Sequence, residues 1–317
     1  MSQVEQTVSA ADETQKPQRL LTMRSGGWVL VLAGVLSLAI VVWRLSVILH
    51  TLGTPVVGDG RHVATYGYDL STCLIPRDQL QAAGFPKDGI PAMFTPEHMT
   101  IQAADALTDE MKSHHQGRFM VAHQAVIGVT VNGESRAYPL KIVTWHEIVN
   151  DTLGGVPIAV TYNPLCNSVV VFDRRVGDET LTFGVSGLVY NSNGLLYDRR
   201  DDPADESLWL QMQFRAVAGP AAERGDTLRV LPCVTMRWSD WIERHPDSTV
   251  LAPVMERLAV YKRTWAEYFG NDGLKFPVEP LPEYDRAYKT AVIAIRPADA
   301  WHVFSWEFLA EQAGGAG

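Results

Sequence analysis

The fold prediction starts from residues 125–140, which read AVIGVTVNGESRAYPL. Two runs rich in apolar residues, 125–131 and 135–140, flank Asn132-Gly133-Glu134. Asn-Gly accepts the positive φ values that a tight turn between antiparallel strands requires. This stretch therefore predicts a β-hairpin.

The segments after this hairpin are short and mostly strand-like. Residues 141–151 (KIVTWHEIVND) carry apolar side chains at 142, 145, 148 and 149, which is helical spacing, and Gly154-Gly155 would end that helix. A second short helix is expected at 238–244, residues 85–96 are expected to form a loop, and residues 109–117 a polar surface segment. Strands are expected at 158–162, 169–173, 181–185, 195–197, 207–211, 228–231 and 291–295, with a turn at Gly177-Asp178. The predicted class is α+β, a β-rich single globular domain with few short helices.

An apolar segment precedes this domain. Residues 25–43 (SGGWVLVLAGVLSLAIVVW) carry no charge and are followed, after Arg44, by the apolar residues 45–49. A helix of this length is sufficient for a hydrocarbon core of roughly 30 Å. A cleaved signal peptide is the alternative, but its apolar region is shorter and ends at a small-residue cleavage site, which residues 49–52 do not offer. We expect one N-terminal transmembrane helix.

The expected organisation follows from this helix. Residues 1–24 form a disordered cytoplasmic tail, 25–49 the anchor, 50–68 a linker and 69–317 the exported domain. Lys16, Arg19 and Arg24 precede the anchor, which favours a cytoplasmic N-terminus. The expected location is the cell inner membrane, with a single pass and the main domain periplasmic or extracellular.

The overall charge limits the expected partners. The 317 residues carry a formal net charge of -9 and show no basic stripe, which argues against nucleic-acid binding. The expected partner is the lipid bilayer, contacted through residues 25–49, and the sequence identifies no protein partner.

Ordered motifs point to one family. They are PKDGIP (86–91), VIGVTVNGESRAYPL (126–140), WHEIVNDTLGG (145–155), TYNPLCNSVVVFDR (161–174), FGVSGLVYNSN (183–193), LYDRR (196–200) and ESLW (206–209). With these motifs the chain resembles, from about Asp69 to Arg296, the prokaryotic family called domain of unknown function 3179. The chain departs from that family at two positions: relatives often carry cysteine in place of Asn163, and usually leucine in place of Gly194. The first departure argues against a shared dithiol mechanism.

Three cysteines, at positions 73, 166 and 233, are the first candidates for chemistry. Cys73 and Cys233 lie outside the central motifs, so a structural disulfide between them is one expectation in an oxidising compartment. Cys166 follows Pro164-Leu165 at a turn that enters a strand. Its thiolate could act as a nucleophile or a metal ligand, and the alternative is a small buried apolar residue.

His146 and Glu147 are the expected companions of Cys166. A neighbouring imidazole would activate the thiol, with Glu147, Asp151 or Asn191 orienting the ring. The same sulfur and imidazole would also suit copper or zinc, with His123 or Met212 as a further ligand. His114-His115 is a weaker metal candidate, because no complete ligand spacing is present.

A further polar set lies in the matched motifs. We assign these residues to the architecture of the site first and to cofactor or substrate contacts second: Asn191, Asn193, Asp198, Arg199, Glu206, Ser207 and Trp209.

Three functions remain open from the sequence. The first is a membrane-anchored metal-binding protein using Cys166, His146 and His123, with copper or zinc as its cofactor. The second is an enzyme with Cys166 as nucleophile, His146 as base and Glu147 as orienting group, acting on an envelope substrate without a cofactor. The third is a non-catalytic tethered binding or scaffold module.

Overall fold

The chain divides into two units in the computed structural model, which describes residues 27–52, 56–281, 283, 287–295 and 302–314. The division falls after Pro55. The expected tail 1–24, with its basic residues, and linker positions 53–55 lie outside the described residues. The first unit contains α1 (Gly27–Leu52).

Helix α1 contains most of the apolar segment expected as an anchor. Its described side chains between Trp28 and Trp43 are all exposed. In the part of the chain whose side chains are described, which omits Leu30 and residues 45–52, no helix is found that is long and apolar enough to cross a membrane.

The second unit, from Val56 onward, is built mainly from three β-sheets. The β3 sheet has the order β15 (Cys233–Arg237), β3 (Ala125–Val131), β4 (Glu134–Pro139), β16 (Thr249–Leu251) and β2 (His98–Thr100). The β6 sheet has the order β14 (Arg229–Leu231), β7 (Ser168–Asp173), β6 (Val156–Asn163) and β5 (Ile148–Leu153). The β10 sheet has the order β1 (Leu80–Ala82), β10 (Phe183–Tyr190), β11 (Asn193–Asp198), β12 (Leu208–Leu210) and β13 (Arg215–Ala218). Neighbouring strands are antiparallel except β4 and β16, which are parallel.

Shorter elements complete this unit. Two small ribbons pair β8 (Arg175–Val176) with β9 (Glu179–Thr180) and β17 (Val292–Ile295) with β18 (His302–Ser305). The α-helices are α2 (Ile101–Ser113), α3 (Leu140–Val143), α4 (Pro220–Arg224), α5 (Trp238–Arg244), α6 (Ala266–Phe269) and α7 (Trp306–Gly314). The 3-10 turns are η2 (Val63–Tyr66), η3 (Arg77–Gln79), η4 (Pro203–Asp205), η5 (Gln211–Gln213), η6 (Met255–Arg257) and η7 (Val260–Lys262). The β-rich prediction with few short helices is confirmed.

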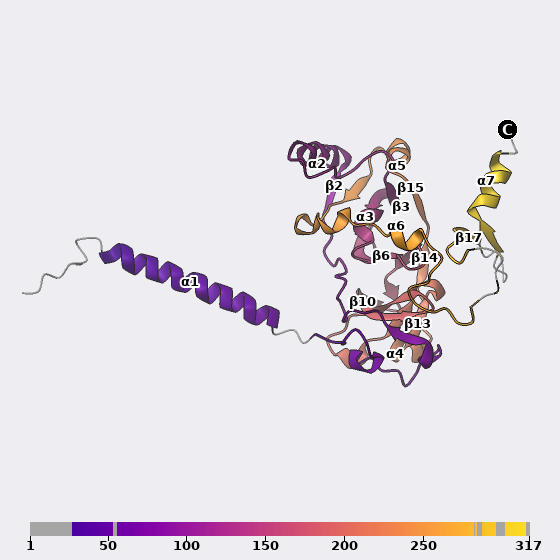
Figure 1. The fold of residues 1–317 in the computed structure, drawn as a ribbon, viewed down its shortest axis with the longest axis horizontal. Coiled ribbons are helices and arrows are strands. Elements are labelled where there is room, and N and C mark those ends of the chain that lie inside the picture. Colours follow the sequence, from indigo (N-terminus) through magenta and orange to yellow (C-terminus); the bar gives the residue numbers. More distant parts are fainter. Residues whose placement is uncertain (1–26, 53–55, 282, 284–286, 296–301, 315–317) are drawn as a thin grey trace, which may run out of the picture. The chain divides into compact units, whose positions relative to one another are not determined.

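The β6 sheet is the middle layer. Along β6, Ile158 and Val160 pack into a core shared with the β3 sheet, whereas Ala159 packs into a second core shared with the β10 sheet. Side chains alternate across a strand, so one apolar strand can fill both cores. In Figure 1 the layers follow one another from β2 and β3 through β6 and β14 to β10 and β13. Both faces of the β6 sheet are therefore buried.

The predicted hairpin is confirmed. Strands β3 and β4 pair from Val126 with Pro139 to Val131 with Glu134, and Asn132 and Gly133 have φ values of 49° and 85°. The first strand of the hairpin also requires glycine at position 128, because a Cβ atom there would lie 2.1 Å from the ring of Trp241. Glycine at this position lets α5 pack closely on the hairpin.

The helix expected over 141–151 is only partly formed. Helix α3 ends at Val143, and β5 begins at Ile148. Two sharp turns at 144–147 redirect the chain, so the apolar residues 148 and 149 belong to a buried strand rather than to a helix face. The helical prediction was wrong for 148–151.

Residues 109–117 are exposed as expected, except for the buried Met111, and residues 109–113 belong to α2. The Thr100 hydroxyl caps the N-terminus of this helix by accepting a hydrogen bond from Ala103 N at 3.2 Å. All three cysteines are free thiols, so the suggested disulfide between Cys73 and Cys233 is absent. The short helix expected at 238–244 and the loop at 85–96 agree with the structure except for an isolated bridge at Met93.

Candidate functional site

Glu147 lies at the sharpest bend between α3 and β5. Its N–H donates to Val143 O at 2.7 Å, and its carbonyl accepts from Tyr162 N at 2.8 Å. The residue has a φ of 57°, a left-handed value that is uncommon outside glycine and asparagine. Such a conformation costs on the order of 1 kcal/mol and is found preferentially where a side chain must point in a required direction.

Cys166 lies on the turn that joins β6 to β7. Asn163 begins this turn, and its side-chain oxygen accepts a hydrogen bond from Leu165 N at 2.9 Å. Asn167 ends the turn with a φ of 49°, and its side-chain oxygen accepts a hydrogen bond from the Tyr162 hydroxyl at 2.9 Å. These side-chain bonds fix the loop, and Cys166 is exposed at its tip.

The Cys166 sulfur contacts two polar side chains. The Asn193 amide nitrogen donates to Sγ at 3.2 Å, and the Ser168 hydroxyl lies 2.9 Å from it. Gln211 continues the network, because its Oε1 accepts from Ser168 at 2.7 Å and its Nε2 donates to the Thr161 hydroxyl at 2.9 Å. The Asn193 amide and the Ser168–Gln211 pair therefore fix the position of the sulfur.

A cavity of about 220 Å³ opens between these two turns and the β10–β11 hairpin. Its wall includes Glu147 and both Asn163 and Leu165 from the cysteine turn. The remaining lining is mostly apolar: Ala83, Phe85, Ile90, Trp145, Val185, Leu188, Val189, Gly194, Trp265, Lys275 and Phe276. At Gly194 a Cβ atom would lie 3.3 Å from the Asn163 amide nitrogen and 3.7 Å from Glu147 Oε2. The missing side chain therefore keeps the polar part of the cavity open.

A segment from the C-terminal part of the unit covers this cavity. Residues 264–279, named here the covering segment, contribute Trp265, Lys275 and Phe276 to the lining. Tyr268 donates to Leu165 O at 3.0 Å. The β10–β11 turn holds the other end, because Ser192 donates to Phe276 O at 2.6 Å and the Asn191 amide pairs with the backbone of Glu279.

Glu147 is the group in this cavity whose pKa is unusual. Burial raises the pKa of its carboxyl to about 8, against a smaller opposing effect of the positive charge on Lys275. Within the described residues, no hydrogen bond reaches the Glu147 carboxyl. Burial, then the charges of Cys166 and Glu147, raise the pKa of Tyr162 to about 12. The thiol and the carboxyl therefore act on the same phenol from two neighbouring turns.

Buried polar atoms without partners add to this pattern. Trp265 lines the cavity, and its Nε1 has no hydrogen-bond partner among the described residues. The Asn193 oxygen is likewise unpartnered there, although the side chain is only 5% exposed. Such groups are costly when left unsatisfied, which is typical of a site that receives polar atoms from a ligand.

The sequence was compared with known families, curated proteins and solved structures. Residues 87–315, more than two thirds of the chain, match the family described as "Protein of unknown function (DUF3179)". The chain is a member of the DUF3179 family. Neither the curated proteins nor the solved structures contain a significant match. The cysteine turn, Glu147 and the Asn193–Gln211 network all lie inside the family region, as the resemblance of the motifs predicted.

The structure of this DUF3179 domain gives His146 a role different from the expected one. The ring is 3% exposed, and Nδ1 and Nε2 lie 2.7 Å from Pro91 O and from the Tyr261 hydroxyl. Because a carbonyl only accepts, Nδ1 donates and Nε2 accepts. Burial lowers the pKa of His146, so the ring is neutral at pH 7. Both ring nitrogens are occupied, and no hydrogen bond joins His146 to Cys166 in the described part of the chain.

The expected metal ligands are not brought together either. His123 is exposed in the turn before β3, and Met212 is exposed in η5. His115 lies after α2, away from the cysteine turn in the sequence and in a different cavity. Among the described residues, no three His, Cys, Asp or Glu side chains converge in a way that could hold a metal ion.

The polar set expected first as architecture and second as cofactor or substrate contacts has structural partners in this DUF3179 domain. Asp198 is fully buried, pairs with Arg200, and accepts a hydrogen bond from Ser207 N at 2.6 Å. Ser207 accepts from Ala221 N at 2.9 Å. Arg199 pairs with Asp88 at 3.2 Å, and Trp209 packs edge-on against Phe183 in the core. Of this set, only Asn191 and Asn193 contact parts of the candidate site.

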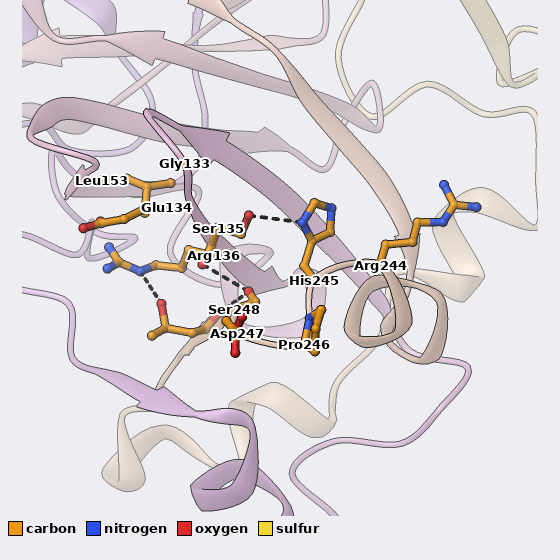
Figure 2. A pocket seen from close by; sticks show the side chains of 11 residues that line it. Gly133, Glu134, Ser135, Arg136, Leu153, Arg244, His245, Pro246, Asp247 and Ser248 are labelled. Carbon is orange, nitrogen blue, oxygen red and sulfur yellow. Dashed lines mark hydrogen bonds between the residues drawn. The ribbon is translucent and has the colours of Figure 1, made fainter.

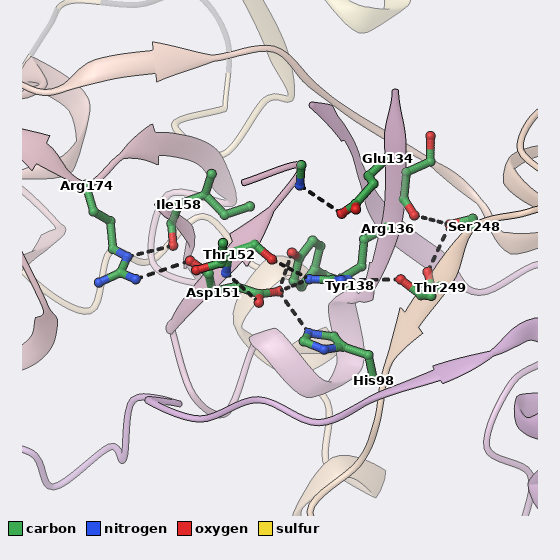
Figure 3. Close-up of polar contacts among 12 residues, drawn as sticks. His98, Glu134, Arg136, Tyr138, Asp151, Thr152, Ile158, Arg174, Ser248 and Thr249 are labelled. Atoms are coloured by element: carbon green, nitrogen blue, oxygen red, sulfur yellow. Dashed lines mark hydrogen bonds and ion pairs between the residues drawn. The ribbon is translucent and has the colours of Figure 1, made fainter. Parts of the chain in front are cut away.

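Asp151 was considered as a group that orients His146, and the structure places it elsewhere. Its Oδ2 lies 2.9 Å from His98 Nε2, 2.8 Å from Arg136 Nη1 and 2.7 Å from the Tyr138 hydroxyl (Figure 3). These partners belong to the β3 sheet, whereas Asn150 bonds to Phe183 in the β10 sheet. Alternation along β5 therefore directs Asp151 to the opposite layer from the cavity, where it joins two sheets.

A larger polar cleft lies on the β3 sheet. It has a volume of about 510 Å³, and its lining includes Ser135, Arg244 and His245. The Ser135 hydroxyl lies 3.1 Å from His245 Nδ1 (Figure 2). The His245 ring also stacks on Trp241, with 3.9 Å between the ring centres. Ser135 also bonds to Thr130 at 2.8 Å. This serine–histidine contact has no carboxylate orienting the ring among the described residues, so we place the candidate site at Cys166 and Glu147.

Proposed function

We propose that this chain is a membrane-anchored extracytoplasmic enzyme of the acyl-transfer or hydrolysis class. Cys166 is the nucleophile, Glu147 exchanges the proton, and the cavity holds the acyl group. The observation that carries the proposal is the unpaired carboxyl of Glu147, with a pKa near 8, on a strained turn beside the cysteine turn. Strain and a raised carboxyl pKa together mark functional sites more often than structural ones.

The reaction follows from the protonation states. Cys166 reacts as the thiolate after its proton has passed to solvent, and its sulfur forms a bond to the acyl carbon. The bond from that carbon to the leaving group breaks, and the protonated Glu147 gives its proton to the leaving group. Water then cleaves the thioester and returns a proton to Glu147, which restores the thiolate. A carboxyl with a pKa near the working pH can give and take this proton.

The cavity indicates the size and polarity of the acyl group. Its volume of about 220 Å³ and its apolar wall suit a short aliphatic or aromatic acyl chain. The unpartnered indole N–H of Trp265 offers a hydrogen bond to a carbonyl or carboxylate oxygen. Glu147 replaces His146 as the proton-exchanging group in this proposal, because the histidine is already bonded on both nitrogens.

The test uses p-nitrophenyl butyrate as an acyl donor. We expect the full chain to release p-nitrophenol and to carry a butyryl group on the peptide that contains Cys166. Cys166→Ser should abolish both, and Glu147→Gln should slow thioester hydrolysis so that the butyryl-enzyme accumulates. Cys233→Ser removes another exposed thiol and serves as the matched control. If Cys166→Ser keeps the wild-type rate, or if the wild type shows no butyryl-Cys166, the enzymatic proposal fails and a non-catalytic module remains.

The anchor is the second part of the proposal. It is supported by the uncharged run 25–43, by the helical structure of α1 and by the exposure of its described apolar side chains. With Lys16, Arg19 and Arg24 on the cytoplasmic side, the domain would lie outside the cytoplasm. A membrane-impermeant maleimide should then label exposed Cys166 in intact cells, and labelling only after lysis would place the domain in the cytoplasm.

A further inference from the structure

A second cavity lies beside Tyr261, the hydrogen-bond partner of His146. It has a volume of about 510 Å³ and is formed where the loop after α2 meets α3 and η7. Tyr261, whose hydroxyl bonds to His146, is one of its lining residues. This cavity shares no lining residue with the Glu147 cavity.

The charges around this cavity all have one sign. Its lining contains the basic residues His115, Arg118, Lys141 and Lys262, and no aspartate or glutamate. None of the four forms an ion pair with a described residue, although the whole chain carries a net charge of -9. Unpaired like charges repel one another, so converging them on one cavity is unfavourable unless an anion neutralises them.

Lys141 is held at the inner end of this group. Its ammonium donates hydrogen bonds to Arg118 O at 3.2 Å and to Phe119 O, and lies 5.4 Å from the centre of the Phe119 ring. An ammonium group has three donors, so one remains for a ligand. Burial lowers the pKa of Lys141 to about 8, which means that the charge is poorly solvated and would gain from a bound anion.

The rest of the lining is apolar or neutral. Met111, Phe119, Pro253 and Leu258 supply apolar surface beside the basic residues, and Gln116 and Gln124 supply amides. Arg118, Lys141 and Lys262 together suit a dianion better than a single carboxylate, and the volume leaves room for a substituent beyond the anionic group.

We propose that this cavity binds a phosphate ester whose apolar substituent packs on Met111, Phe119 and Leu258. Arg118, Lys141 and Lys262 neutralise the phosphate. The ester is either a soluble phosphomonoester or the headgroup of an anionic phospholipid, because both present the same phosphate oxygens to these residues. This site is separate from the thiol site and does not depend on it.

The first experiment titrates phenyl phosphate into the full chain in a nonionic detergent and follows binding by calorimetry. We expect saturable binding by the wild type and a loss of about tenfold or more in affinity for the double variant Arg118→Gln, Lys262→Gln. Both side chains are exposed, so neither change should disturb the core. The matched control is Arg61→Gln, Arg244→Gln, which removes the same charge elsewhere and should bind within about twofold of the wild type.

A second experiment distinguishes a soluble phosphomonoester from a phospholipid headgroup as the natural ligand. The full chain is placed in phosphatidylcholine nanodiscs with or without phosphatidylglycerol. If the lipid headgroup is the natural ligand, phosphatidylglycerol should weaken phenyl phosphate binding by competition, and if the ligand is soluble it should not. Absence of saturable binding in both detergent and phosphatidylcholine nanodiscs overturns the proposal, as does equal affinity of the wild type and the Arg118/Lys262 double variant.

Discussion

Replacing Glu147 by glutamine should make the domain more stable while removing its proposed activity. Glutamine has nearly the same shape and no charge, and it keeps the strained backbone. In the wild type, burial raises the pKa of this carboxyl from an ordinary value of 4.5 to about 8. At pH 7 the folded state therefore holds a proton that the unfolded chain has released.

The size and sign of the effect follow from this difference. One pKa unit corresponds to about 1.36 kcal/mol, so keeping the proton at pH 7 costs the wild type roughly 3 kcal/mol. Because the folded-state pKa is raised, wild-type stability is complete below pH 4.5 and is lost progressively as the pH rises to about 8. Glutamine does not titrate, so the advantage of the variant should grow across this same range and then level off.

The assay is urea unfolding followed by tryptophan fluorescence at several pH values between about 4 and 9. Glu243→Gln, at an exposed position of α5, provides the matched control and should change the free energy of unfolding by less than about 0.5 kcal/mol at every pH. Should Glu147→Gln show the same pH dependence as the wild type, the carboxyl is not held in a protonated state and the proposed proton exchange loses its basis. A gain in stability with a loss of butyryl ester turnover is the expected trade-off at an active site.

Three other substitutions test separate parts of the structure. Asp151→Asn should lower the free energy of unfolding by roughly 3 kcal/mol in denaturant titrations, because it leaves Arg136 buried without its counter-charge. Burial alone would raise the pKa of Asp151, but hydrogen bonds from His98 and Tyr138 and the charge of Arg136 lower it to about 2. The wild-type advantage in stability should therefore fade as the pH falls from 3.8 through 2. Gly128→Ala should cost about 1–3 kcal/mol in the same titrations, because its Cβ would meet Trp241. Gly194→Leu should fill the cavity, so that Cys166 still reacts with iodoacetamide but no longer with p-nitrophenyl butyrate; unchanged butyrylation would show that the cavity does not receive the acyl group.

Local sequence signals predicted the parts of the fold that local interactions determine. The β3–β4 hairpin was predictable because Asn132-Gly133 supplies the turn and the flanking residues supply the strands. The helix expected at 141–151 is formed only as far as Val143. The turn at Glu147 could not be predicted because it contains no glycine, and tertiary contacts rather than local preference hold its positive φ. Helix α2 was missed because most of its residues are exposed and only Ala104 and Met111 are buried, which leaves a weak apolar pattern.

Local sequence signals also predicted only part of the candidate site. Cys166 could be selected from its place in a turn that enters a strand, but the sequence favoured His146 as its partner, with Glu147 only orienting the ring, and the structure does not support that choice. Adjacent residues of a tight turn point in different directions, and only the structure shows that the histidine faces Tyr261 while the glutamate faces the cavity. Trp265 and Lys275 lie about 100 residues further along the chain, and no local pattern connects them to the cysteine turn.

The two departures from the family pattern meet in this cavity. Where the family resemblance implies cysteine and leucine, this chain carries Asn163 and Gly194, and both line the same cavity as Glu147. The Asn163 oxygen fixes the turn through Leu165 N, while its nitrogen faces the space that the absent side chain of residue 194 leaves open. A second thiol here would favour disulfide exchange with Cys166, whereas an amide leaves a single sulfur and a wider polar opening. The two positions are therefore close in space, because a Cβ atom at position 194 would lie 3.3 Å from the Asn163 amide nitrogen.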